Sequence, residues 1–338
     1  MSKFPFNRPA IYTALLSEQV MGINSNHAVY SSVVSDEYTI RTPDALMSGL
    51  ATQMLIQSCC PTLLNPSKIL LCDIQHLLAI IKIATQGPNL EVLLKCPKCG
   101  EHDPYEINLQ HNITTLSAKM WFHSLNIENL FINFRSPTYE EFCKFSIEDF
   151  KLSKQLYQLS QLDTTEDYSG ITASLLEKKR QLQLDFQTLC ITSISDNNEI
   201  ITSSRPYIKE WFNQCDISIQ KKIVSYIDAA RDENRLKNFI ATCTTCSHDF
   251  TVPIDLDVSN IFRQKLIPAS EPEILDIINQ FGQETKDITN DLLKMIWYMR
   301  GSISYSESYG LTLYERQCIS KIIETNIELT KESGMVFI

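Results

Sequence analysis

Apolar residues recur at helical spacing in several stretches of the chain and alternate with polar residues in a few short ones. From Asp73 to Gln86 the apolar positions lie three or four residues apart, which predicts a helix with one buried face. Gly87-Pro88 ends that helix. Composition, prolines and capping residues predict helices over residues 42–60, 140–162, 171–189, 207–214, 216–232, 270–282 and 287–300. A last helix begins at Thr312, and its apolar positions again mark one packed side. Short alternating runs predict strands at 105–109 and 250–256 and a hairpin over 190–201.

Capping residues mark several of the predicted helix starts. Thr42-Pro43-Asp44 supplies an N-cap, a proline in the first turn and an acid, and Asp216 caps a later helix. Thr312 and Glu315 form a capping box. Residues 1–40 lack a steady period, so they are predicted as an extended arm with strands near 27–34 and 38–41. Such an arm is often a solvated terminus; in an assembling protein it can become ordered on a neighbouring protein.

Two cysteine pairs carry the clearest chemical pattern in the chain. Cys96-Pro97-Lys98-Cys99 is followed by Gly100, and the second pair is Cys243-Thr244-Thr245-Cys246. A C-x-x-C step in a tight turn directs both sulfurs at one point, and two such steps complete the tetrahedral shell that Zn²⁺ prefers. An apolar run enters each pair and a predicted strand leaves it. The pairs therefore predict one structural zinc site.

More than a hundred residues separate the two pairs, whereas ordinary zinc ribbons separate them by tens. The intervening residues 111–238 must then form an insertion whose ends lie side by side. Other interpretations stay open: two buried free-thiol pairs, redox chemistry, or replacement of one sulfur by His248 or His102. Redox chemistry of the thioredoxin kind needs a helix that starts at the first cysteine, and Gly100 with the polar run after it disfavours one.

The resulting fold class is α+β, mainly α, with a zinc-ribbon-like core split by a large helical insertion and flanked by N- and C-terminal helices. We expect five parts, in chain order: an extended arm 1–40, a helical segment with the first knuckle 41–110, the insertion 111–238, the second knuckle 239–257 and a helical region 258–338. A chain of 338 residues with 43% hydrophobic and 21% charged residues is typical of a globular protein of two or three compact units.

Charge and motifs exclude several classes of function. The net charge of −10 disfavours a nucleic-acid surface, which needs clustered cations. No apolar run of eighteen residues and no signal-peptide pattern occurs, so we expect no membrane partner and a reducing cytoplasm, where the other seven cysteines are mostly core thiols. No phosphate-binding, nucleophile-elbow or zinc-protease motif occurs, and four thiolates leave zinc no open position. We therefore expect no catalytic residues; His76 is expected at the surface or its boundary.

The order of these motifs resembles that of the baseplate hub proteins and related tail-assembly proteins of T-even-type contractile-tailed bacteriophages. The likeness spans roughly residues 40–330. It rests on Leu77-Leu78-Ala79-Ile80, Cys96-Pro97-Lys98-Cys99-Gly100, Tyr105-Glu106-Ile107-Asn108-Leu109, Ile191-Thr192-Ser193-Ile194, Pro206-Tyr207-Ile208, Cys243-Thr244-Thr245-Cys246, Val252-Pro253-Ile254-Asp255-Leu256, Ile296-Trp297-Tyr298-Met299 and Leu311-Thr312-Leu313-Tyr314-Glu315-Arg316. Two positions depart from the pattern: Ser247 stands where the family tends to have glycine, and Ile261-Phe262 replaces a Phe-Phe pair.

The resemblance implies a non-enzymatic late protein of the virion tail, either built into the baseplate hub or assisting its assembly. Its partners would be other baseplate and tail proteins, and its location the host cytoplasm during assembly and the baseplate of the virion. The alternative is a zinc-ribbon module that binds nucleic acid or serves transcription. Trp297 and Tyr298 are expected in the C-terminal core, with a contact surface for a partner as the other interpretation. Residues 302–310 are expected as an inter-helix loop or as a second contact surface.

Overall fold

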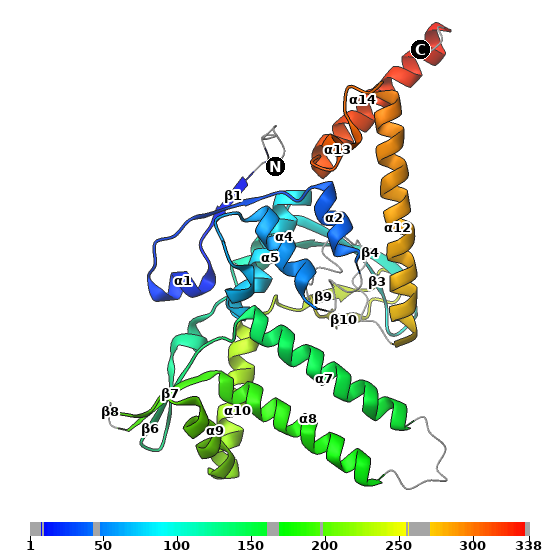
Figure 1. Cartoon of the computed structure of the whole chain (residues 1–338). Helices are drawn as coiled ribbons and strands as arrows, with labels where there is room; N and C mark the ends of the chain where they lie inside the picture. Colours follow the sequence, from blue (N-terminus) through cyan, green and yellow to red (C-terminus); the bar gives the residue numbers. More distant parts are fainter. Residues whose placement is uncertain are drawn as a thin grey trace.

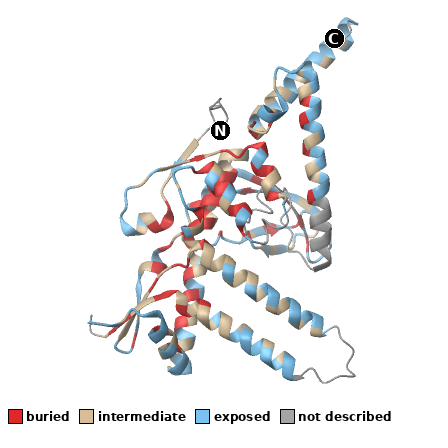
Figure 2. Ribbon diagram, viewed as in Figure 1, coloured by how far each residue is buried: buried red, intermediate tan, exposed pale blue. Residues whose placement is uncertain are grey.

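Helix α5 (Leu71–Gln86) runs through the middle of the molecule, and the other elements pack around it (Figure 1). This computed structural model describes residues 8, 10–42, 48–160, 169–196, 199–254, 256 and 271–334. Ten residues of α5 between Cys72 and Lys82 are buried, because helices and strands from the N-terminal, central and C-terminal parts of the chain contact it. The buried residues of the molecule are concentrated around this helix (Figure 2). The chain is α+β and mainly α, as the sequence predicts.

Residues 10–40 fold onto α5 and do not form an extended arm. Strand β1 (Ala10–Thr13) pairs antiparallel with β2 (His27–Tyr30), and helices α1 (Leu16–Met21) and α2 (Val34–Ile40) flank them. The buried apolar side chains of this segment are Leu15, Leu16, Val29, Val33, Val34 and Ile40. The predicted strand at 38–41 is also wrong, because Tyr38 lies in α2. Elements of four to seven residues are too short to show a period, so only tertiary contacts define them.

Helix α4 (Leu50–Cys59) lies against α2 and α5. Its predicted start at Thr42-Pro43-Asp44 falls at and beyond the edge of the described residues. The helix follows Gly49, whose φ is +73°, and a Cβ at Gly49 would lie 2.3 Å from Sγ of Cys143. Only glycine fits this close approach.

His76 is buried in α5 with 4% of its surface exposed, so its expected place at the surface is wrong. Its Nε2 lies 3.0 Å from Oγ1 of Thr13 in β1. Asp73, one turn earlier, accepts hydrogen bonds from the backbone N and Oγ of Ser17 at 2.9 and 2.6 Å. The N-terminal segment covers the side chains of His76 and Asp73. The spacing of apolar residues within α5 does not predict this burial, because the covering residues lie elsewhere in the chain.

Two short antiparallel hairpins carry the cysteine pairs. Strand β3 (Asn89–Lys95) pairs with β4 (His102–Asn108), and β9 (Phe239–Thr242) pairs with β10 (Asp249–Val252). The predicted strands at 105–109 and 250–256 correspond to β4 and β10. A short helix, α6 (Leu109–Ile113), follows the first hairpin.

The chain between the hairpins forms a small sheet and two helical pairs. Its elements are the 3₁₀ helix η2 (Lys119–Phe122), β5 (Ser124–Ile127), β6 (Leu130–Phe134), α7 (Tyr139–Ser160), α8 (Ser169–Leu189), β7 (Ile191–Asp196), β8 (Glu199–Thr202), α9 (Arg205–Gln214) and α10 (Ile217–Glu233). Another 3₁₀ helix, η1 (Pro66–Lys68), lies before the first hairpin, between α4 and α5. The strands form one antiparallel sheet in the order β5-β6-β7-β8. Helices α7 and α8 project from the body as a long hairpin (Figure 1). The four helices and the β7–β8 hairpin were predicted, whereas β5 and β6 were not; most of the predicted loop 164–170 lies outside the described residues.

Contacts between η2 and α10 hold the two ends of this intervening segment together. The indole Nε1 of Trp121 donates to Oδ1 of Asn234 at 2.5 Å, and the Tyr226 hydroxyl donates to the carbonyl of Met120 at 2.7 Å. The backbone N of Met120 donates to Oε2 of Glu233 at 2.9 Å. These bonds place the end of α10, just before β9, beside η2, which follows the first hairpin in the chain.

The described residues of the C-terminal region form three helices: α12 (Glu271–Tyr298), α13 (Tyr305–Ser308) and α14 (Leu313–Ser333). The two helices predicted on either side of Gly282 are one continuous helix, because a glycine costs a helix only about 1 kcal/mol. The predicted capping box is present, with Thr312 Oγ1 accepting from the backbone N of Glu315. The expected core position of Trp297 is wrong, since 80% of its surface is exposed. Residues 258–266 lie outside the described residues, and within the described part no helix is long and apolar enough to cross a membrane.

Helix α2 attaches the C-terminal helices to the rest of the molecule. The backbone N of Val34 donates to the carbonyl of Leu311 at 3.1 Å, and that of Ser35 donates to Tyr309 at 3.1 Å. Val34 is buried in a small apolar cluster with Ile288, Leu292, Met295 and Leu311. The segment 302–310 therefore packs against α2 through Tyr309, whose ring centroid lies 5.2 Å from that of Tyr38.

Candidate metal centre

The two C-x-x-C steps adopt the same backbone turn. In the first, the backbone N of Gly100 donates to the carbonyl of Cys96 at 2.9 Å, and the N of Cys96 donates to the carbonyl of Glu101 at 2.8 Å. In the second, Ser247 donates to Cys243 and Cys243 donates to His248, each at 3.0 Å. The residue after each second cysteine has a positive φ, +78° at Gly100 and +52° at Ser247. Ser247 therefore makes the turn that glycine makes in the first knuckle.

The structure brings the four predicted cysteines together. Sγ of Cys96 lies 3.7 Å from Sγ of Cys246, and Sγ of Cys99 lies 3.5 Å from Sγ of Cys243. All four sulfurs lie within 4.8 Å of one another. A zinc ion bound to four sulfurs at about 2.3 Å in a tetrahedron places the sulfurs roughly 3.8 Å apart. The donor set and its spacing thus fit a tetrahedral metal ion with no change in the backbone turns.

Backbone N–H groups point at the sulfurs and favour their charged form. Burial alone raises the pKa of the Cys96 thiol, but the N–H groups of Cys99 and Lys98 lower that pKa to about 7. The N–H of Glu101 acts on Cys99 in the same direction, yet partial desolvation and the three neighbouring sulfurs raise the pKa of Cys99 to about 12. One thiolate therefore disfavours the next. A divalent cation removes this conflict because it binds all four as thiolates.

Polar and aromatic side chains join the two hairpins beside the sulfurs. Asp103 in β4 accepts hydrogen bonds from the backbone N and the hydroxyl of Thr244, at 3.1 and 2.9 Å. The Tyr105 hydroxyl donates to the carbonyl of Thr242 at 3.1 Å, and its ring packs edge-on against Phe239 and Phe250. No pattern in the sequence predicts these contacts, because residues of β4 meet residues some 140 positions later only in the folded chain.

The histidines beside the pairs take no part in the cluster. Among the described residues, the group of close metal-ligating atoms at this site consists of the four cysteine sulfurs, with no nitrogen from His102 or His248. His102 lies in β4 opposite Lys95, and the carbonyl of His248 closes the second turn. The arrangement also differs from a redox dithiol, since the first cysteine begins a turn between two strands and not a helix.

The seven other cysteines lie away from this cluster. Cys59, Cys60, Cys72 and Cys190 are buried, which agrees with the predicted core role, whereas Cys143, Cys215 and Cys318 are half-buried. Burial raises the pKa of the Cys190 thiol to about 12, so this thiol stays protonated at neutral pH.

Comparison with known proteins identifies the family of the chain. A family model described as "T4 bacteriophage base plate protein" matches residues 38–263, about two thirds of the chain. The matched range contains both cysteine pairs and the whole segment between them. Searches of curated proteins and of solved structures gave no match. The chain therefore belongs to the T4 bacteriophage base plate protein family.

Proposed function

We propose that this protein serves the phage tail baseplate hub as a structural or assembly component, and that it acts through contacts with other tail proteins. The family match over residues 38–263 carries this proposal. The cysteine cluster fits such a role, because it joins two segments far apart in the chain and stiffens the centre of the matched region. A stiff body with projecting helices is suited to organising other proteins.

A single Zn²⁺ ion bound by Cys96, Cys99, Cys243 and Cys246 is part of this proposal. The close approach of the four sulfurs and the N–H groups directed at them support it. Zinc supplies cross-linking of the two hairpins and no chemistry, since four protein ligands leave no position for water or substrate. We accordingly propose a protein without catalytic turnover.

The nucleic-acid alternative has no specific observation in its favour. The first hairpin and its knuckle carry Lys95 and Lys98, but also four carboxylates, at Glu91, Glu101, Asp103 and Glu106. A surface of mixed charge on a chain of net charge −10 does not concentrate the cations that phosphate binding requires.

The decisive experiment combines metal analysis with assembly. The full chain, purified under reducing conditions, is expected to contain one zinc per chain by elemental analysis. Co-expression with individual baseplate hub proteins should yield a stable complex, and phage lacking the gene should accumulate incomplete baseplates that electron microscopy detects.

A matched pair of variants separates zinc loss from general damage. Cys246→Ser removes a ligand, whereas Cys318→Ser changes a half-buried cysteine outside the cluster. Normal baseplates in the absence of the gene, together with no complex with any hub protein, would show that the proposed function is wrong.

A further inference from the structure

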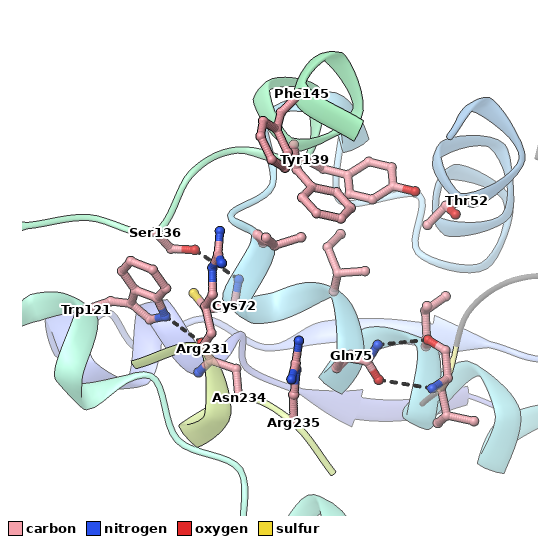
Figure 3. A pocket seen from close by; sticks show the side chains of 15 residues that line it. Thr52, Cys72, Gln75, Trp121, Ser136, Tyr139, Phe145, Arg231, Asn234 and Arg235 are labelled. Atoms are coloured by element: carbon pink, nitrogen blue, oxygen red, sulfur yellow. Dashed lines mark hydrogen bonds between the residues drawn. The ribbon is translucent and has the colours of Figure 1, made fainter. Parts of the chain in front are cut away.

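A pocket of about 340 Å³ lies where α5, the start of α7 and the end of α10 meet (Figure 3). This volume falls within the range of roughly 300–1,000 Å³ of small-ligand sites. Rings of Trp121, Tyr139 and Phe145 form part of its wall, and the side chains of Arg231 and Arg235 extend into it toward Tyr139 and Phe145. The pocket is separate from the cysteine cluster, and nothing in the proposed function uses it.

Among the described residues that line this pocket, the charged ones are Arg231 and Arg235, and none of them is a carboxylate. Their ion pairs are with Asp228 at 3.7 Å and Asp232 at 3.3 Å, three residues earlier in each case, and both carboxylates are more than half exposed. Exposed pairs of this kind contribute about 0–1 kcal/mol. A guanidinium has five N–H donors, so donors remain for a ligand in the pocket.

The other polar groups of the pocket hold its walls in place. The Gln75 side chain donates to the carbonyl of Leu256 at 3.0 Å and accepts from its backbone N at 3.3 Å. Asn234 accepts from Trp121, and the Ser136 hydroxyl accepts from the backbone N of Cys72 at 3.1 Å. These internal bonds fix the shape of the pocket before any ligand binds and leave the arginines as the groups that select its charge.

Arg231 is itself held in place. Its guanidinium carbon lies 5.1 Å from the ring centroid of Phe186 in α8, a cation–π contact, and its side chain is 30% exposed. Arg235 is more exposed, at 71%. The pocket thus combines one positioned and one adjustable cation beside an aromatic wall, and a positioned cation loses little entropy when a ligand binds.

We propose that this pocket binds the carboxylate of an acidic side chain of a partner protein, with an apolar side chain beside it. The planar guanidinium matches a carboxylate in two-point hydrogen bonding, and the aromatic rings accommodate the apolar neighbour. That the partner is a tail protein rests on the proposed function; that the ligand is a carboxylate with an apolar neighbour rests on the pocket alone.

Three small probes test the ligand chemistry on the full zinc-loaded chain. These are 3-phenylpropionate, its uncharged amide, and inorganic phosphate, with binding measured by NMR titration. We expect the carboxylate to bind at least about tenfold more tightly than the amide, as hydrogen bonds to a charged group imply. Arg235→Gln should weaken carboxylate binding by a similar factor. Lys237→Gln, an equal change of charge just outside the pocket, should leave it within about twofold.

Contrary outcomes are equally distinct. Equal binding of acid and amide, tighter binding of phosphate, or a Lys237→Gln effect as large as that of Arg235→Gln would each overturn the carboxylate assignment. Because the Arg235 side chain is exposed, Arg235→Gln should keep the wild-type melting temperature. Arg231→Gln is a second test of the same pocket at a partly buried arginine.

A second measurement tests the partner. Hub-protein complexes should be weakened by Arg231→Gln/Arg235→Gln and not by Lys237→Gln. If a complex forms and the double variant leaves it unchanged, the pocket is not the partner site, although the proposed function stands. If the probes bind as expected and no hub protein does, the carboxylate site stands and the proposed function fails.

Discussion

Gly100 and Ser247 occupy equivalent positions in the two knuckles, and each has a positive φ. For a residue with a Cβ this conformation costs roughly 1–2 kcal/mol. A Cβ at Gly100 would lie 3.9 Å from the nearest side-chain atom, which belongs to Lys95, so space does not restrict this position. The difference between the two residues is therefore one of backbone conformation.

We predict that Ser247→Gly stabilises the protein by about 0.5–1 kcal/mol. Glycine adopts the required φ without strain, and this gain exceeds the larger conformational entropy that glycine loses on folding. Gly100→Ala should destabilise it by about 1 kcal/mol. Urea unfolding of the zinc-loaded protein measures both. A destabilised Ser247→Gly variant would mean that the serine hydroxyl makes a contact that outweighs the strain.

His76 and Asp73 illustrate how burial sets the charge of a side chain. Burial lowers the pKa of His76 to about 4, from an ordinary value of 6.5, although the backbone at Ala14 opposes the shift. Burial raises the pKa of Asp73 to about 6, against the hydrogen bonds from Ser17. The folded protein thus binds fewer protons at His76, and more at Asp73, than the unfolded chain does.

We predict that His76 makes the protein less stable as pH falls from 6.5 to 4, since only the unfolded chain is readily protonated there. The loss is at most about 3 kcal/mol. His76→Gln should therefore gain stability relative to wild type over this range, measured as unfolding free energy at several pH values. Asp73→Asn is the opposite control, because it should lose stability relative to wild type as pH falls from about 6 to 3.8. Parallel pH curves for wild type and His76→Gln would contradict the assignment.

At the scale of elements, sequence periodicity was informative where an element was long. Helices α7, α8 and α10 and the hairpin β7–β8 were predicted within a few residues of their observed bounds. The missed elements are short or depend on neighbours: α2 has seven residues, β5 has four and pairs with β6, and β6 pairs with β7 across a long separation in the chain. The cysteine site was predicted because four residues of special chemistry mark it, whereas the pocket of Arg231 and Arg235 has no such mark in the sequence.

Helix α2 carries the ion pairs that hold the C-terminal helices. Glu37 pairs with Arg316 of α14, and Arg41 lies 3.1 Å from Glu284 of α12 and 3.8 Å from Glu37. The side chains of Glu37, Arg41 and Arg316 are at most 14% exposed. Burial raises the pKa of Glu37 in spite of the two arginines, which shows how strongly this site is removed from water.

We predict that Glu37→Gln destabilises the docking of α12 and α14 by about 3 kcal/mol, because it leaves buried arginines without their carboxylate. Hydrogen exchange of backbone amides should rise in these two helices before it rises in α5. Lys294→Gln is the matched control, since its 4.0 Å pair with Asp291 on α12 is exposed and should contribute less than about 0.5 kcal/mol. Equal exchange in both variants would show that apolar packing around Val34 alone holds the helices.

At the scale of the whole molecule, one large hydrophobic core joins distant parts of the chain. Buried residues of the N-terminal segment, of α5, of both hairpins and of α10 belong to one cluster. Removal of residues 1–40 would therefore expose the core, and it cannot serve as the deletion of a free binding arm. The intervening segment is likewise packed against α5 at its base, so the chain behaves as one body with projecting helices.

The cysteine cluster brings together two segments that are distant in the chain, since Cys99 and Cys243 lie 144 positions apart. We predict that Cys99→Ser releases zinc and raises hydrogen exchange in both hairpins, although the change lies only in the first. Cys99 is exposed, so the loss, on the order of several kcal/mol, reflects the metal and not a cavity in the core. Cys318→Ser should keep one zinc and a wild-type exchange pattern. If exchange in Cys99→Ser rises in β3 and β4 alone, Asp103, Tyr105 and the surrounding core hold the second hairpin without the metal.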